Sequence, residues 1–177
     1  MGTTTNEIQF ETSRLIIRPL KRQEIPALYQ LMFSPFVLKF NMLEKISYAD
    51  FEQEYQTDDP GNLYLIRKTD GRLLGQISLQ PDTIRFGVKS LNLSYWLGAD
   101  FAQQGYMKEA LAALIPILFQ THSYELLTAR VFSPNLASQK LLAGLGFQRE
   151  AYLKHAVRNS AGTVFDDIFY VLFNPSN

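Results

Sequence analysis

The sequence of 177 residues has no cysteine and only two histidines. Without cysteine the chain has neither a disulfide framework nor a thiolate metal site, and two separate histidines do not indicate a metal centre. Seventeen Lys and Arg residues balance seventeen Asp and Glu residues. The chain therefore has no excess positive charge with which to hold a nucleic-acid backbone, and we expect no direct nucleic-acid partner.

Long apolar runs are also missing. No run approaches the roughly 20 residues that a membrane-spanning helix needs, and residues 1–5 lack the basic and then apolar pattern of a signal peptide. We therefore expect a cytoplasmic protein without membrane association. The composition is that of a globular protein, 46% hydrophobic and 19% charged, and the length fits a single domain spanning residues 1–177.

The order of predicted elements indicates one layered α/β (α+β) domain. It reads strand, two helices, three strands, helix, strand, helix and two strands, which differs from a regular doubly wound sheet. Asp70-Gly71 predicts a hairpin turn between two strands, and the turn at 159–162 predicts another between the last two. Apolar periodicity and β-branched runs predict strands at 13–19, 62–67, 72–80, 89–97, 124–132, 147–157 and 164–173, and helices at 23–33, 48–55, 106–118 and 133–146.

Capping residues mark the boundaries of two of these helices. Ser47 is placed to cap the helix that starts at Tyr48. Ser133 is placed to cap a later helix, with Pro134 at its first helical position and Gly146 at its end.

The stretch from Tyr95 to Leu118 carries the clearest functional signal. It predicts a strand, a polar loop and a helix with one apolar face. The start of a helix exposes unpaired backbone N–H groups at the positive end of its dipole, where phosphate groups bind. Gly105 lets the backbone approach an anion closely, and no acidic side chain stands between Ala102 and Lys108. A ligand bearing a diphosphate is one interpretation, and an ordinary turn between strand and helix is the other.

This stretch resembles the acyl-CoA pyrophosphate loop of the GNAT N-acetyltransferases, in particular the RimJ/RimL type. Ala102 and Gln103 depart from the family pattern of that loop. The resemblance implies a GNAT-like domain, in which helices flank a mixed, mostly antiparallel sheet whose strands splay apart around the cofactor. The matching segments are Arg14-Leu15-Ile16-Ile17-Arg18-Pro19, Tyr95-Trp96-Leu97, Gly105-Tyr106-Met107-Lys108-Glu109-Ala110, Asn135-Leu136-Ala137-Ser138, Leu145-Gly146-Phe147 and Phe165-Asp166-Asp167-Ile168-Phe169-Tyr170.

The resemblance implies that acetyl-CoA is the acetyl donor and that several residues bind it. The backbone of Tyr95, Trp96 and Leu97 would hold the pantetheine arm and polarise the thioester. Ser138 would protonate the departing thiolate, while Asn135 would bond the cofactor arm; some relatives place a tyrosine where this chain has Leu142. The loop donors would be the backbone N–H groups of Gln103, Gln104, Gly105, Tyr106, Met107 and Lys108.

The general base is the least defined part of the predicted site. Asn92 stands where relatives place a glutamate, and an amide can orient a water molecule but cannot accept a proton at neutral pH. Either the base comes from Asp166, Asp167 or the acidic segment around residues 44–59, or little base strength is needed. That segment is either a solvated helix face or a rim that attracts a cationic substrate. Its acidic residues are Glu44, Asp50, Glu52, Glu54, Asp58 and Asp59.

Two classes of function remain open from the sequence. The first is an acetyltransferase that acts on the α-amine of a protein or peptide N-terminus, with a polyamine or another small amine as the alternative acceptor. If the acidic segment is a rim that attracts cations, the accepted N-terminus would belong to a basic chain. The second is a CoA-binding regulatory module without catalysis. A homodimer is compatible with either class.

Overall fold

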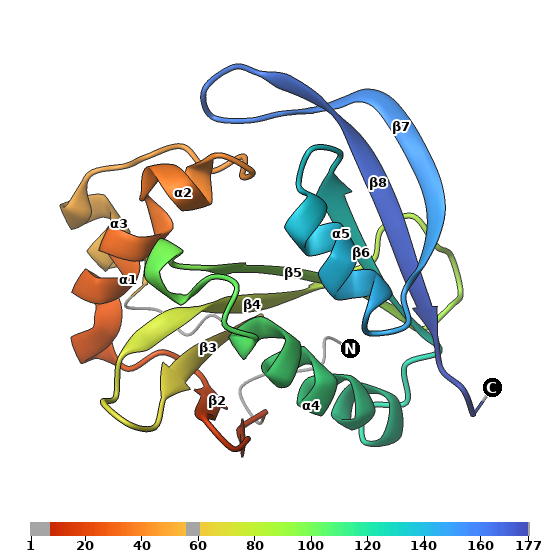
Figure 1. Cartoon of the computed structure of the whole chain (residues 1–177), viewed down its shortest axis with the longest axis horizontal. Helices are drawn as coiled ribbons and strands as arrows, with labels where there is room; N and C mark the ends of the chain where they lie inside the picture. Colours follow the sequence, from red (N-terminus) through yellow and green to blue (C-terminus); the bar gives the residue numbers. More distant parts are fainter. Residues whose placement is uncertain (1–7, 56–60, 177) are drawn as a thin grey trace.

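The computed structural model describes residues 8–55 and 61–176, in which eight strands form one open sheet (Figure 1). The strand order is β1-β2-β3-β4-β5-β6-β8-β7. Only β5 and β6 run parallel, and the other neighbours are antiparallel. The predicted mixed, mostly antiparallel sheet is therefore confirmed. The strands are β1 (Phe10–Glu11), β2 (Leu15–Arg18), β3 (Asn62–Arg67), β4 (Leu73–Pro81), β5 (Ser90–Leu97), β6 (Leu126–Phe132), β7 (Gln148–Arg158) and β8 (Val164–Phe173).

Helices cover both faces of the sheet. Consecutive side chains of a strand point to opposite faces, and in β3 Leu63 and Leu65 join one hydrophobic cluster while Tyr64 and Ile66 join a second. The first cluster contains apolar residues of α4 and α5, and the second contains those of α1 and α3. The helices are α1 (Ile25–Met32), α2 (Pro35–Leu38), α3 (Tyr48–Glu54), α4 (Tyr106–Gln120) and α5 (Leu136–Ala143).

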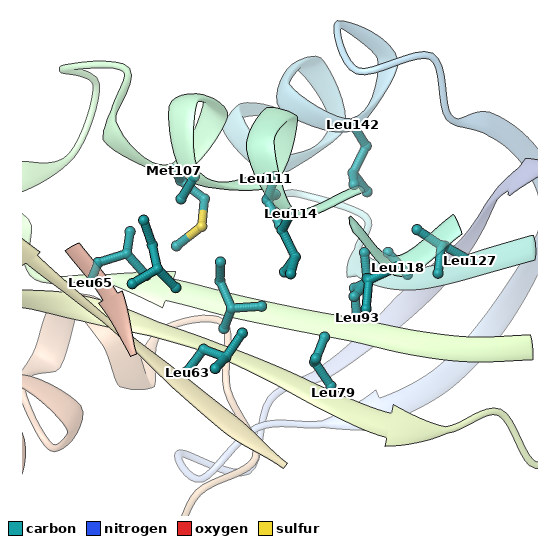
Figure 2. Packing of buried hydrophobic residues seen from close by; sticks show 14 of the residues in the cluster. Leu63, Leu65, Leu79, Leu93, Met107, Leu111, Leu114, Leu118, Leu127 and Leu142 are labelled. Atoms are coloured by element: carbon teal, nitrogen blue, oxygen red, sulfur yellow. The ribbon is translucent and has the colours of Figure 1, made fainter. Parts of the chain in front are cut away.

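The apolar face of α4 forms the centre of the larger core. Leu111 and Leu114 are fully buried against the sheet, and Figure 2 shows the leucines of four strands pointing toward them. Burial of one such side chain stabilises the fold by about 1.5–3 kcal/mol. The helix that follows the polar loop is thus fixed rigidly on the sheet, and its N-terminus is fixed with it.

The structure confirms most predicted elements and corrects one helix start. Ser47 caps α3 as predicted, accepting a hydrogen bond from the Asp50 N–H. Ser133 does not cap α5: Asn135 does, and the helix begins at Leu136. The Ser133 N–H instead donates to the Asp166 carbonyl. Ser133 therefore still continues the β6–β8 pairing. The helix ends at Ala143, before Gly146, and the sequence reading missed the short elements β1 and α2.

Strands β5 and β6 separate halfway along their length. They pair from Ser90 and Leu126 only as far as Leu93 and Ala129, whereas β5 continues to pair with β4 up to Leu97. Gly75 lies opposite Leu97, where an added Cβ would meet the Trp96 carbonyl oxygen at 2.2 Å. Because β4 and β5 approach this closely, β5 stays paired with β4 while it separates from β6. The sheet therefore opens between β5 and β6.

Among the described residues, no helix has the length and apolar character that would let it cross a bilayer. Over the same residues, no three His, Asp or Glu side chains gather in a way that could hold a metal ion.

Candidate active site

A cleft of about 310 Å³ lies where β5 and β6 separate. Both strands supply part of its wall, and the other described residues of the lining are residues 40–42, Asn135 and Ser138 at the start of α5, Val157 of β7 and Asp167 of β8. The tip of the β7–β8 hairpin arches toward α2 (Figure 1), where the Asn159 amide donates to the Lys39 carbonyl at 3.3 Å. The structure brings five of the predicted site residues to this cleft: Asn92, Tyr95, Trp96, Asn135 and Ser138.

Tyr95 and Ser138 form a hydrogen-bonded pair across the opening of the sheet. The Tyr95 hydroxyl lies 2.7 Å from the Ser138 Oγ, and either group can donate. Burial raises the pKa of Tyr95 to about 12 against the opposing effect of the Ser138 hydrogen bond. The phenol therefore keeps its proton at neutral pH. The sequence reading assigned Tyr95 only a backbone role and missed this side-chain contact.

Asn135 is held by its capping role at the start of α5. Its Oδ1 accepts the Ser138 N–H at 3.2 Å, which fixes both side chains relative to the helix. Within the described residues the Asn135 Nδ2 has no hydrogen-bond partner, and the residue lines the cleft. The amide N–H groups are thus the part of Asn135 that can reach a ligand.

Asn92 lies on the paired half of β5 and is bound to its neighbour. Its Nδ2 donates to the Thr128 Oγ1 at 3.1 Å, across the parallel pair that these two residues form. The amide oxygen accepts no hydrogen bond from the described part of the chain. Asn92 can therefore orient a polar group or a water molecule, but it supplies no base.

The loop before α4 has the backbone arrangement that suits an anion. Gln103 and Gly105 have left-handed φ angles of 59° and 80°, and no side chain caps the helix. The first backbone hydrogen bond of the helix comes from the Glu109 N–H to the Gly105 carbonyl. Among the described residues, the backbone N–H groups of 103–108 consequently have no acceptor. Unpaired donors at a helix N-terminus fit a phosphate group. Residues 103–108 and Leu97 are not among the residues that line the cleft.

A clamp that the sequence reading missed ties this loop to the start of β2. The Glu109 carboxylate accepts hydrogen bonds from Thr12 Oγ1 at 2.6 Å, from Ser13 Oγ at 2.9 Å and from the Arg14 Nε at 2.6 Å. The Arg14 guanidinium also donates to the Gln104 carbonyl at 3.0 Å and lies over the Tyr106 ring. The clamp fixes the position of the loop and places a cation beside it.

The clamp predicts that Glu109→Gln lowers stability at neutral pH. Burial raises the pKa of Glu109, but the hydrogen bonds from Thr12 and Arg14 outweigh it and hold the value at about 2. The pKa of Glu109 is lower in the folded than in the unfolded chain. The contribution of the ionised carboxylate to the free energy of unfolding is therefore complete above about pH 4.5 and is lost as the pH falls toward 2. We expect a loss of about 1–3 kcal/mol in urea unfolding at pH 7.

The difference between Glu109→Gln and wild type should shrink as the pH falls below about 4.5. Glu150→Gln serves as the control because the Glu150 side chain is 39% exposed against 18% for Glu109, and an exposed carboxylate in an ion pair, such as this one with Arg85, contributes about 0–1 kcal/mol. A Glu109→Gln loss no larger than that of the control at pH 7 would contradict the clamp.

The two aspartates considered as bases have different surroundings. Asp166 accepts hydrogen bonds from the Tyr152 hydroxyl at 2.6 Å and from the His155 N–H at 2.8 Å, and these lower its pKa. It holds the irregular part of β7 and does not line the cleft. Asp167 does line the cleft, is 1% exposed and forms an ion pair with Arg130. Burial raises the pKa of Asp167, and Arg130 opposes that shift.

The described acidic residues of the segment around residues 44–59 are not part of the cleft lining. Asp58 and Asp59 fall outside the described residues, and the other four acidic residues do not line the cleft. Asp50 is exposed and Glu52 half-buried on α3, where they accept hydrogen bonds from the Ser47 and Tyr48 hydroxyls. This part of the segment has the features of a solvated helix face.

Comparison with known proteins agrees with the fold. The family profile described as the acetyltransferase (GNAT) domain matches residues 14–148. The uncharacterised N-acetyltransferase YoaA of Bacillus subtilis (strain 168) is 23% identical over 173 residues, which cover 93% of this chain and 96% of that protein.

Two solved structures share the fold over nearly their whole length. Ribosomal-protein-S5-alanine acetyltransferase from Vibrio fischeri has a TM-score of 0.79 at 20% identity, with 96% of this chain and 98% of that chain covered. RimL, a ribosomal L7/L12 α-N-protein acetyltransferase in complex with coenzyme A, has a TM-score of 0.79 at 18% identity, with 96% and 100% covered. The profile match extends over more than half of the chain. The chain therefore belongs to the GNAT family and is an acyl-CoA-dependent N-acetyltransferase.

Proposed function

We propose that this protein transfers an acetyl group from acetyl-CoA to the α-amine of a peptide or protein N-terminus. The observation that carries the proposal is that the described residues of the cleft lining include no carboxylate without a cationic partner. Asn92 stands at the position of the expected glutamate, and the one carboxylate of the lining, Asp167, is paired with Arg130.

A site with little base strength favours the more acidic ammonium group. An α-amine has a pKa near 8 and a lysine side chain near 10.4, so at pH 7 roughly a tenth of the first but only about 0.04% of the second is neutral. The difference corresponds to about 3 kcal/mol of deprotonation. A peptide N-terminus therefore presents far more of the nucleophilic form without help from the enzyme.

The unpaired backbone donors are the part of the chain that fits the donor substrate. The N–H groups of 103–108 would bind its diphosphate, and the Arg14 guanidinium beside them adds positive charge. Residues 95–97 of β5, which have no partner in β6, offer backbone groups to the pantetheine arm. When bound, acetyl-CoA supplies an activated thioester carbonyl to the amine.

The pair of Tyr95 and Ser138 would supply the proton that the leaving thiolate needs. Both hydroxyls stay protonated at neutral pH, since burial raises the pKa of Tyr95 to about 12. Tyr95 can donate to Ser138 Oγ as that hydroxyl gives its own proton to the thiolate, and the proton that the acylated amine then loses restores the phenol. This relay requires no ionised group in the resting site.

The names of two structural neighbours support this class of acceptor. They name acetyltransferases of ribosomal-protein N-termini or of a ribosomal-protein alanine. Their identity to this chain is 20% or less, so the support is for the class of acceptor and not for a particular protein.

A comparison of acceptors tests the proposal. We expect kcat/KM for a peptide with a free α-amine to exceed the values for an N-terminally blocked lysine peptide and for spermidine at pH 7. The ratio of kcat/KM for the α-amine peptide to that for the lysine peptide should fall between pH 6 and 9. Once the α-amine is deprotonated, its neutral fraction no longer rises with pH, whereas the neutral fraction of the lysine side chain still does. A preference for spermidine at neutral pH would favour the polyamine alternative. If no candidate amine releases free thiol from acetyl-CoA, the alternative of a CoA-binding module is the better one.

A further inference from the structure

Arg130 is held in a fixed orientation at the edge of the cleft. Its Nε donates to the Asp167 Oδ2 at 2.6 Å, and its Nη2 lies 2.6 Å from the same oxygen. Its guanidinium carbon lies 4.8 Å from the centroid of the Phe169 ring. An arginine fixed by a buried carboxylate and an aromatic ring loses little further rotamer freedom when it binds a ligand.

The rest of the guanidinium is available to a ligand. Its side chain is 44% exposed, and both N–H groups of Nη1 lack an acceptor among the described residues. Arg130 is also the only cationic side chain among the described residues that line the cleft. Exposed, oriented donors in a binding cleft are a recognition feature, whereas Asp167 has the role of positioning them.

Arg130 lies on the opposite face of the sheet from Ser138. Alternation along β6 sets Thr128, Arg130 and Phe132 on one face and Val131 on the other, and Asn92 shares the face of Thr128 through their register. The Ser138 hydroxyl belongs to α5, which packs on the other face through Leu142. The cleft thus has a hydroxyl pair on one side of the sheet and an arginine on the other.

An apolar wall stands beside Arg130. Phe132 stacks on Phe165 with ring centroids 5.6 Å apart, and Phe40 meets both rings edge-on. Phe40 and Phe132 line the cleft together with Met42. The combination of oriented N–H donors and an apolar wall suits an amino-acid residue with its carbonyl group, and it does not suit a polyamine, whose ammonium groups Arg130 would repel.

We propose that Arg130 is a specificity-determining residue that donates hydrogen bonds to the backbone carbonyl oxygen of the first residue of the acceptor peptide. Every peptide N-terminus has this carbonyl group bonded to the Cα atom that carries its α-amine, and spermidine has no carbonyl group. Arg130 thereby orients the α-amine and selects peptides over polyamines. The inference rests on the proposed function and identifies how the same site would recognise its acceptor.

The test is a cycle between enzyme variants and matched acceptors. The acceptors are a short peptide, the same peptide with its first carbonyl replaced by a thiocarbonyl, which is a weaker hydrogen-bond acceptor, and spermidine. The variants are Arg130→Gln and Arg130→Lys, with Arg149→Lys as the control because Arg149 is exposed on β7 and does not line the cleft. The measured quantity is kcat/KM at pH 8.

We expect Arg130→Gln to lower kcat/KM for the peptide by about 10- to 100-fold, the range for loss of a hydrogen bond from a charged donor. For the thioamide peptide, the substitution should lower kcat/KM by a several-fold smaller factor, and for spermidine it should not lower kcat/KM. The Arg149→Lys control should have the wild-type kcat/KM for all three acceptors. Arg130→Lys keeps the charge but not the planar fork, so it should lose preference for the peptide over the thioamide while remaining folded.

Equal losses for the peptide and the thioamide, or no loss for either, would overturn the inference. If Arg130→Gln does not fold because Asp167 is left buried without a partner, the Lys variant gives the same comparison. A different result would contradict the proposed function, namely a higher kcat/KM of wild type for spermidine than for the peptide. In that case the difference between the two peptides still shows whether Arg130 binds the carbonyl oxygen.

Discussion

Replacing Ser138 with alanine is expected to lower kcat by about 100- to 10,000-fold, the range for loss of a general acid. The hydroxyl would stabilise only the transition state, in which the thiolate departs, so the dissociation constant of acetyl-CoA should change little. Measurement of kcat in steady state and of acetyl-CoA affinity by calorimetry separates the two effects. Equal losses in turnover and affinity would assign Ser138 to binding and remove it from proton transfer.

Tyr95→Phe provides the companion measurement, since it removes the other half of the pair. If the two hydroxyls act as one relay, the double variant should be little slower than the slower single variant, because residues that act as a unit are not additive. Ser90→Ala is the control, as the Ser90 hydroxyl contacts only the nearby Val88 carbonyl at 3.4 Å. Fully additive losses would mean that Tyr95 and Ser138 serve separate purposes.

Saturating acetyl-CoA is expected to raise the Tm of wild type, and Gly105→Val should abolish that rise. A ligand at about 100 times its dissociation constant stabilises the native state by about 2.7 kcal/mol, which corresponds to roughly 5–10 °C for a domain of this size. Gly105 has a φ of 80°, and a β-branched residue adopts this conformation only with strain. The substitution should therefore displace the backbone donors at 103–108.

Gly87→Val is the matched control for backbone strain. Gly87 has a φ of 73° and lies in an exposed loop with no atom within 4 Å of an added Cβ. We expect this variant to lose stability for the same reason as Gly105→Val but to keep the full Tm rise with acetyl-CoA. If wild type shows no rise at all, the assignment of acetyl-CoA to this loop is wrong; if both variants keep the rise, the loop conformation does not matter for binding.

Sequence patterns predicted the elements whose determinants are local. Alternating apolar residues on both sides of Asp70-Gly71 predicted the β3–β4 hairpin, and the Ser47 hydroxyl predicted the start of α3; both are confirmed. The start of α5 was placed wrongly because Ser133 and Asn135 are equally good capping residues. The choice between them depends on the Asp166 carbonyl, which takes the Ser133 N–H and keeps it in the sheet.

The sequence by itself determined that the chain resembles an acyl-CoA acetyltransferase, because the loop, the glycine and the apolar helix that follows are contiguous. It also gave Asn92 and Ser138 as candidate site residues, and both line the cleft. Because residue 92 is an asparagine, it cannot act as a base. Such conclusions depend on residue type and spacing, which local propensity and helix geometry convert directly into structure.

Only the tertiary structure decided which side chains meet. Tyr95 contacts Ser138 over a separation of 43 residues, Arg130 contacts Asp167 over 37, and Arg14 contacts Glu109 over 95. These contacts depend on strand register and on the point at which β5 leaves β6, and both are set by pairing between distant segments. A shift of one residue in register would turn Arg130 and Asp167 to the other face of the sheet, so no pattern within one segment could have predicted the cleft that they share.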